Sequence, residues 1–169
     1  HKKAIAVTRA GNVIGGGDWA KDRIVPDIVR ALQQSKPVTV RNPYAVRPWQ
    51  HVLEPVGGYL QLGEALAREP LAFADAWNFG PLAEDTFTVE QLVQVALKTW
   101  GNGTYDKPAL QGQPHEAGLL KLDISKAMSQ LQWKPQWNAA NAISMTIQWY
   151  KHWSEGTEAA TLVERDIRL

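Results

Sequence analysis

The first segment that could do chemistry is glycine-rich and runs from Gly11 to Asp18, after a short apolar run and before a helical pattern. Ligands approach open α/β sheets at strand-to-helix connections of this kind, and consecutive glycine N–H groups can cradle an anion. The segment is not G-x-G-x-x-G, however, and it lacks the Lys and the hydroxyl of a Walker loop. Taken alone, it is better explained as a tight connection that needs positive φ.

Two arginines that could bind phosphate stand beside prolines a little further on. Arg41 precedes Asn42 and Pro43, and Arg47 precedes Pro48 and Trp49. Planar guanidinium groups held on a stiff backbone suit two-point recognition of phosphate. An arginine in a loop is more often a solvated surface residue, so both interpretations stay open at this level.

Histidines beside acidic residues occur at two places. His51 stands three residues before Glu54, a spacing that suits a metal on a helix, but no third ligand is apparent. A structural hydrogen bond is therefore favoured there, and no metal site is predicted. His115 and Glu116 stand in a loop rich in Gly and Pro, where they are weak evidence for a polar ligand contact. No Ser/His/Asp arrangement and no carboxylate pair predicts a catalytic set.

The elements that must position these residues alternate short apolar runs with longer periodic ones. A continuous apolar run predicts a strand buried on both faces at Ala4 to Val7. Further short strands are predicted at 38–40, 49–53, 76–79 and 119–122. Helical spacing of apolar residues predicts helices at 24–32, 56–66, 88–101, 123–131 and 138–153, and the charged tail could form one more.

Local signals mark several helix ends and faces. Asp22 is placed to cap the first helix, and Pro26 is tolerated only in its first turn. The segment Thr88 to Gln91 has the form of a capping box, and Gly101 ends that helix. Trp149 and Trp153, four residues apart, predict packing in a core or a subunit contact. The apolar face of the second helix is predicted from Val56, Tyr59, Leu60, Gly63 and Leu66.

Length and composition narrow the class of protein. The 169 residues and 18.8 kDa fit one domain or part of a larger one, and a first residue that is His rather than Met suggests a piece of a longer protein. With 44% hydrophobic residues, 21% charged residues and a net charge of +1, the chain is neither disordered nor a strongly basic nucleic-acid or membrane-surface binder. The absence of cysteine excludes disulfides and thiolate chemistry. With no signal peptide or membrane-spanning run, a cytoplasmic location is predicted.

Taken in order, the segments resemble one family, the extended short-chain dehydrogenase/reductases that act on nucleotide sugars. TRAGNVIGG is similar to the family's T-R-x-x-N-x-x-G strand and loop, RPWQHVLEP to R-x-W-x-x-V-x-[DE], and WNFGP to [YW]-N-x-G. The longer segments GNVIGGGDWAKDRIVPD, RNPYAVRPWQHVLEP and PHEAGLLKLDISKA resemble those of the dehydratases that use CDP-glucose.

The resemblance implies an NAD-dependent lyase. NAD would take hydride from the fourth carbon of the sugar of CDP-glucose, water would leave across the fifth and sixth carbons, and the hydride would return to the sixth. The 4-keto-6-deoxy product would serve 3,6-dideoxyhexose synthesis for the O-antigen of bacterial lipopolysaccharide. The full-length enzyme is expected to be a homo-oligomer with no nucleic-acid or membrane partner.

The resemblance also assigns binding residues. Asn12 would contact the sugar or its phosphate, and Arg47 and Asn78 would bind the pyrophosphate. His115 or Glu116 would close the nucleotide end. The nucleoside would be surrounded by Arg23, Ile24, Thr39 and Arg41, and the nicotinamide of NAD would lie near Ala10 and Gly11.

One departure from the family is large. The family's glycine fingerprint and its catalytic Tyr-x-x-x-Lys precede the strand that opens this chain, and none of the four tyrosines here has Lys four residues on. The fold expected over residues 1–169 is therefore α/β: the end of a Rossmann-like parallel sheet intertwined with a smaller, mostly helical substrate-binding lobe. The NAD-binding half and the catalytic set would be absent, so the chain alone should be inactive. Alternatives are another nucleotide-sugar dehydratase or epimerase, or a non-catalytic nucleotide-sugar-binding module.

Overall fold

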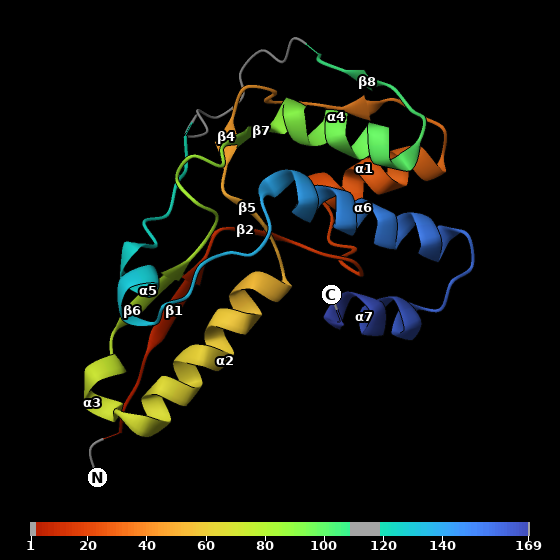
Figure 1. The fold of residues 1–169 in the computed structure, drawn as a ribbon. Coiled ribbons are helices and arrows are strands. Elements are labelled where there is room, and N and C mark those ends of the chain that lie inside the picture. Colours follow the sequence, from red (N-terminus) through yellow and green to blue (C-terminus); the bar gives the residue numbers. More distant parts are fainter. Residues whose placement is uncertain (1–2, 109–118, 169) are drawn as a thin grey trace.

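The computed structural model describes residues 3–108 and 119–168. Short strands alternate with longer helices along the chain (Figure 1). The strands are β1 (Val7–Ala10), β2 (Asn12–Ile14), β3 (Val38–Thr39), β4 (Val46–Arg47), β5 (Trp49–His51), β6 (Ala76–Phe79), β7 (Phe87–Thr88) and β8 (Tyr105–Asp106). The helices are α1 (Ile24–Gln33), α2 (Leu53–Arg68), α3 (Pro70–Phe73), α4 (Val89–Trp100), α5 (Ser125–Gln130), α6 (Ala139–Ser154) and α7 (Ala159–Ile167).

The strands pair two by two, and three of the four pairs are parallel. β1 pairs with β6, β2 with β5 and β3 with β8 in parallel, whereas β4 pairs with β7 in the antiparallel sense. Parallel pairing across long connections is typical of α/β folds, because each parallel return needs a crossover that is usually helical. The predicted fold class is confirmed.

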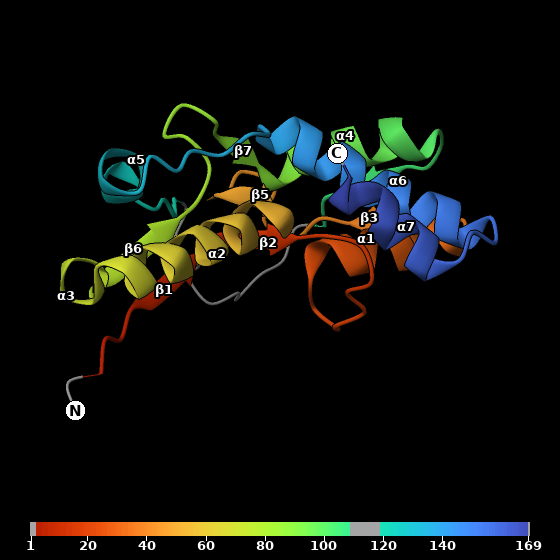
Figure 2. The ribbon, with the colours of Figure 1, turned by 60° about the horizontal axis from the view of Figure 1, so that its bottom comes forward.

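The hydrophobic core has two parts. The larger part lies among α1, α4 and α6 and includes the buried side chains of Ile28, Leu92 and Ile147. The smaller part lies under α2, β6 and α5 around Trp77 and Phe79. Figures 1 and 2 show α4 beside α6 in one lobe, and α2 running along β1 and β6 in the other. The core is thus divided between one cluster among α1, α4 and α6 and another under α2, β6 and α5, and the predicted division into Rossmann elements and a substrate-binding lobe stays a prediction.

Several helix ends follow their local chemistry. The Thr88 hydroxyl accepts from Gln91 N and the Gln91 side chain accepts from Thr88 N, so the predicted capping box is confirmed. The helix ends at Gly101, whose φ of 99° is left-handed. Pro26 lies in the first turn of α1, as predicted, but Asp22 does not cap that helix. Asp22 has a φ of 60°, which turns the chain before the helix begins, so the capping prediction is wrong.

Two strand predictions need correction. The first strand begins at Val7 rather than Ala4, and Ile5 and Val7 are 68% and 55% exposed instead of buried. Among the described residues β1 pairs with β6 alone, which leaves its other edge open. The apolar run at 119–122 forms no strand: Leu119 makes one isolated bridge to Val46, and both Leu119 and Leu120 are exposed.

The buried face of α2 is not the one that its large apolar residues predict. Leu60 is 72% exposed, and Val56 and Tyr59 are also exposed, whereas Gly58 faces the core. A Cβ on Gly58 would lie 2.4 Å from the Phe79 ring, so the helix packs there through bare backbone. A close approach through glycine leaves no apolar signal in the sequence, which is why the periodicity points to the wrong side.

Two adjacent glycines of α2 give a matched test of this packing. A Cβ on Gly57 would meet nothing within 4 Å, so Gly57→Ala should stabilise the fold by about 0.5–1 kcal/mol through helix propensity. Gly58→Ala should destabilise it by about 1–3 kcal/mol, because the methyl overpacks against Phe79. Denaturant unfolding of both variants measures the two changes. Equal changes of the same sign in the free energy of unfolding of the two variants would contradict the placement of α2.

None of the helices in the described parts of the chain is long and apolar enough to cross a membrane.

Candidate functional site

A cavity of about 660 Å³ opens where β2 ends and α1 begins. β2 and the loop after it form one wall, the first turns of α1 form the second, and residues in and around β3 to β5 form the third. Its apolar surface comes from Ile24, Val25, Pro26, Val38 and Trp49, among others. A concave, partly apolar cavity with a few convergent polar groups is the usual form of a small-molecule site.

The cavity brings together most of the substrate-binding residues that the sequence predicts. Asn12 comes from β2, Arg47 from β4, and the others from the elements between them. Residues separated by up to 35 positions in the sequence therefore line the same cavity. The predicted residues that line it are Asn12, Arg23, Ile24, Thr39, Arg41 and Arg47.

Other predicted residues lie elsewhere. Asn78 is on β6, outside the cavity lining, and its amide donates to the Asp123 carbonyl at 3.0 Å. Ala10 and Gly11 also lie outside the lining; Gly11 N donates to the Phe79 carbonyl, and a Cβ on Gly11 would lie 2.7 Å from the Pro48 carbonyl oxygen. His115 and Glu116 fall outside the described residues. The roles predicted for these residues stay predictions.

Charged side chains of both signs line the cavity. Lys21, Arg23, Arg41 and Arg47 are the cationic ones, and Asp18, Asp22 and Asp27 are the acidic ones, so positive groups outnumber negative groups by one. Arg41 lies 3.7 Å from the Asp22 carboxylate, and both side chains are exposed, so this ion pair is weak. The side chains of Lys21 and Arg23 make no hydrogen bond or ion pair within 3–108 or 119–168. Sequence reasoning missed Lys21, whose only signal is its place between the glycine-rich segment and Arg23.

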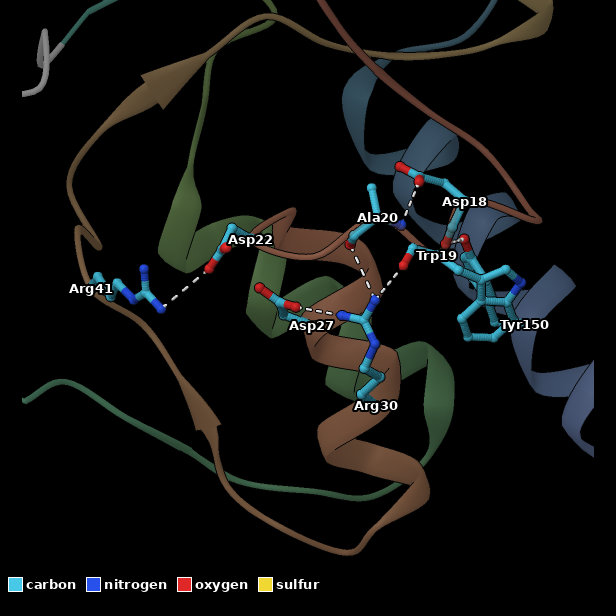
Figure 3. A network of polar contacts seen from close by, with 8 residues as sticks. All are labelled: Asp18, Trp19, Ala20, Asp22, Asp27, Arg30, Arg41 and Tyr150. Carbon is cyan, nitrogen blue, oxygen red and sulfur yellow. Dashed lines mark hydrogen bonds and ion pairs between the residues drawn. The ribbon is translucent and has the colours of Figure 1, made fainter.

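The loop from Gly15 to Arg23, which we call the 15–23 loop, is held from both sides (Figure 3). The Tyr150 hydroxyl of α6 donates to the Asp18 carbonyl at 2.6 Å. The Arg30 guanidinium of α1 donates to the Trp19 carbonyl at 2.5 Å and to the Ala20 carbonyl at 3.1 Å. These contacts set the shape of one wall of the cavity.

The glycines of this loop do not form a dinucleotide-binding turn. In such a turn the glycines open the helix that follows, so that its N-terminus faces the pyrophosphate. Here α1 begins only at Ile24, and Gly16 lies against the Trp149 ring, where a Cβ would be 2.1 Å from Cδ2. The described residues therefore do not fit NAD by themselves. They also contain no group of three side chains that could hold a metal ion.

Glu54 makes structural hydrogen bonds of the kind that the sequence favours, whereas the buried Nε2 of His51 has no hydrogen-bond partner among the described residues. Both are buried; Glu54 Oε1 accepts from the backbone N–H groups of Gln136 and Trp137 at 2.8 and 2.7 Å. His51 packs edge-on against the Trp137 ring, with centroids 5.3 Å apart. The two residues thus tie β5 and the start of α2 to the segment before α6.

The pKa of His51 is lowered from its ordinary 6.5, because burial opposes the charged imidazolium more than Asp166 favours it. Because the pKa is depressed in the folded state, the contribution of neutral His51 to the free energy of unfolding is fully present above pH 6.5. It is lost as pH falls through the folded-state pKa. We therefore expect the midpoint of thermal unfolding to fall between pH 7 and pH 5 more steeply in the wild type than in His51→Gln. If the unfolding midpoints of the two proteins fell in parallel with pH, the inference that His51 is buried in its neutral form would be contradicted.

The fold matches that of nucleotide-sugar epimerases and dehydratases. The structure of UDP-glucuronic acid 4-epimerase from Bacillus cereus with UDP-glucuronic acid and NAD is similar, with a TM-score of 0.73, 19% identity, and 89% of this chain and 46% of that chain covered. dTDP-glucose 4,6-dehydratase from Bacillus anthracis in complex with NAD gives a TM-score of 0.67 at 18% identity, over 89% of this chain and 46% of that one. These likenesses establish that the chain shares the fold of the corresponding part of these enzymes.

Sequence similarity points to one kind of dehydratase within that class. The chain is 45% identical over 167 residues to CDP-glucose 4,6-dehydratase from Salmonella typhimurium. The match covers 99% of this chain and 46% of the relative, so the chain spans about half the length of that enzyme. No protein-family profile matches the chain. The resemblance inferred from the sequence motifs is confirmed.

Proposed function

We propose that the cavity binds CDP-glucose and that the chain is part of an NAD-dependent CDP-glucose 4,6-dehydratase. The observation that carries the proposal is the convergence of Asn12, Arg23, Thr39, Arg41 and Arg47 on one cavity, although they were assigned from separate motifs. The 45% identity to a CDP-glucose 4,6-dehydratase over nearly the whole chain supports the same substrate.

In this proposal the chain's own residues bind and orient the nucleotide sugar. Arg47 and Lys21 supply positive charge for the pyrophosphate. Asn12, which lines the cavity from β2, supplies an amide to the sugar or its phosphate. NAD, when bound, would supply hydride transfer, and a tyrosine and a lysine in an upstream half would move protons. Since no tyrosine of this chain is followed by Lys at the fourth position, the chain by itself supplies no such pair.

Further parts of the proposal concern the biological setting. The product, CDP-4-keto-6-deoxyglucose, would serve 3,6-dideoxyhexose synthesis for lipopolysaccharide O-antigen. The enzyme would work in the cytoplasm as a homo-oligomer. These three statements follow from the resemblance and are tested separately from substrate binding.

Titration calorimetry on the chain tests the substrate. CDP-glucose should bind at least about tenfold more tightly than UDP-glucose or dTDP-glucose, a difference of about 1.4 kcal/mol, because the resemblance places the base beside Arg41 and Asn42, both of which line the cavity. Equal affinity for the three would favour the alternative of another nucleotide-sugar dehydratase or epimerase. Absence of binding by the folded chain would contradict the proposal.

An activity assay separates a binding module from an enzyme. Incubated with NAD and CDP-glucose, the chain should give no alkaline ultraviolet absorbance of a 4-keto sugar, because it lacks the Tyr-x-x-x-Lys pair. The same chain extended by an upstream half that carries this pair should give product. Product from the chain alone would show that its own residues do the chemistry. Its absence from the extended protein would favour a non-catalytic nucleotide-sugar-binding module.

A further inference from the structure

The 15–23 loop supplies a large part of the cavity wall but has little structure of its own. It is neither helix nor strand, and Gly17 and Asp22 have left-handed φ values of 85° and 60°. For a residue other than glycine such a conformation is costly unless its surroundings hold it. The loop residues that line the cavity are Gly15, Asp18, Lys21, Asp22 and Arg23.

Tyr150 holds the first half of this loop from the interior. Its side chain is fully buried in α6, with the hydroxyl 2.6 Å from the Asp18 carbonyl oxygen and 3.3 Å from that of Gly15. A phenol has one proton to donate, so the shorter contact is the hydrogen bond and the Gly15 carbonyl is secondary. Burial raises the pKa of Tyr150 to about 12, which keeps the hydroxyl a donor throughout the neutral range.

Arg30 holds the second half from the solvent side. Its Nη2 donates to two successive carbonyls, those of Trp19 and Ala20, while Nη1 donates to the Asp27 carboxylate at 2.5 Å. Asp27 lies one turn earlier on α1, so the ion pair fixes the fork in the direction of the loop. A planar guanidinium can serve these three acceptors at once, which an ammonium cannot do with the same geometry.

Ring packing fixes the loop between these two anchors. The Trp19 ring packs edge-on to Tyr150 with centroids 5.2 Å apart, and it contacts Trp153 at 4.9 Å. Gly16 lies directly on the Trp149 ring. Trp149 is buried and Trp153 is 38% exposed, so the predicted pair forms one core residue and one residue that packs on the loop. α6 thus offers the loop a surface of three aromatic rings.

We propose that Arg30 and Tyr150 are positioning residues that hold the 15–23 loop so that Lys21 and Arg23 meet the nucleotide sugar. The inference rests on the proposed function, since the ligand is CDP-glucose. Neither residue lines the cavity, so each would act through the loop carbonyls alone. If the loop loses its anchor, the binding-competent fraction falls, and the apparent affinity falls by the same factor.

The variants are chosen to remove an anchor without removing the packing. Tyr150→Phe deletes only the hydroxyl, and its matched control is Thr146→Val, which deletes another buried hydroxyl of α6 that donates to Ala142 within the helix. Arg30→Met keeps most of the side-chain stem, and its matched control is Arg68→Met in the last turn of α2, where the arginine is 3.9 Å from Glu64. Arg30→Lys is a conservative partial replacement.

Affinity for CDP-glucose is measured by calorimetry well below the melting temperature of each variant, together with amide hydrogen exchange over the 15–23 loop. Tyr150→Phe and Arg30→Met should each weaken binding about five- to twentyfold and speed exchange at Trp19 to Arg23, whereas both controls should stay within about twofold. Arg30→Lys should recover part of the affinity, since it keeps the charge but not the fork.

The outcomes separate this inference from the proposed function. Failure of the wild-type chain to bind CDP-glucose would reject the proposed function, and the inference with it. Normal wild-type binding with unchanged affinity in Tyr150→Phe and Arg30→Met would reject the inference alone. An equal loss in Thr146→Val and Tyr150→Phe would also reject it, because the effect would then follow core stability rather than the loop.

Discussion

Arg47→Ala should weaken the binding of CDP-glucose by about ten- to a hundredfold. A charge-assisted hydrogen bond contributes roughly 1.5–3 kcal/mol, and each 1.4 kcal/mol is a factor of ten in affinity. Arg47 lies on β4, lines the cavity, and is followed by Pro48, which stiffens the backbone beside it. Arg47→Lys should recover only part of the loss, because an ammonium keeps the charge without the planar fork.

A structural role for Arg47 makes a different prediction. Its Nη1 donates to the carbonyl of Val46 at 3.0 Å, so the side chain also contacts its own strand. If that contact were its main role, Arg47→Ala would lower the melting temperature and leave the affinity of the folded protein nearly normal. Calorimetry and thermal melts of both variants distinguish the two roles. Unchanged affinity in a well-folded Arg47→Ala chain would end the phosphate assignment.

Helices with sequence signals at both ends were predictable. The helix from Thr88 to Gly101 has a capping box at one end and a left-handed glycine at the other, and the structure has both. The helix predicted at 138–153 is α6, and the structure adds that the Asn138 side chain caps it by accepting from Asn141 N. These signals work because the hydrogen bonds that they report are local, formed between residues three or four positions apart.

Features that depend on distant partners were not predictable. The face of α2 is set by Phe79, some twenty residues away, and by the absence of a side chain on Gly58. In the apolar run at 4–7, Ala6 packs against the smaller core, whereas Ile5 and Val7, on the opposite face, are exposed. Hydrophobic periodicity reports which side chains could be buried, and the partner decides which of them are.

The candidate site could be predicted only through the resemblance. Each arginine, taken alone, was more consistent with a solvated surface residue than with a ligand contact, and the glycine-rich segment was better explained as a turn. The structure has a left-handed Gly17, as a tight connection requires, and it packs Gly16 against Trp149, whereas the anion cradle stays a prediction. No local pattern indicates that Arg30 and Tyr150 meet the loop, because they come from helices 120 residues apart in sequence.

The second large effect concerns stability. Glu54→Ala should destabilise the fold by about 3 kcal/mol, because it removes the buried charged acceptor of two part-buried hydrogen bonds, those from the N–H groups of Gln136 and Trp137. Glu54→Gln should lose less, since its amide oxygen can still accept. Glu64→Ala is the matched control: Glu64 is exposed on the same helix, 3.9 Å from Arg68, so the change should stay within about 0.5 kcal/mol. Denaturant unfolding of the three variants measures these differences.

The pH dependence of Glu54 gives an independent check. Burial raises its pKa above the ordinary 4.5, although the two backbone hydrogen bonds oppose the shift. Both bonds go to Oε1, so Oε2 can take up a proton without breaking either. A raised carboxyl pKa means that the folded state binds the proton more readily than the unfolded state does. The contribution of protonated Glu54 to the free energy of unfolding is therefore fully present below pH 4.5 and is lost as pH rises through the folded-state pKa.

Relative to Glu54→Gln, the wild type should gain stability as pH is lowered toward 4.5. A gain that instead grew with rising pH would show that the hydrogen bonds outweigh burial and that the ionised carboxylate is the favoured form.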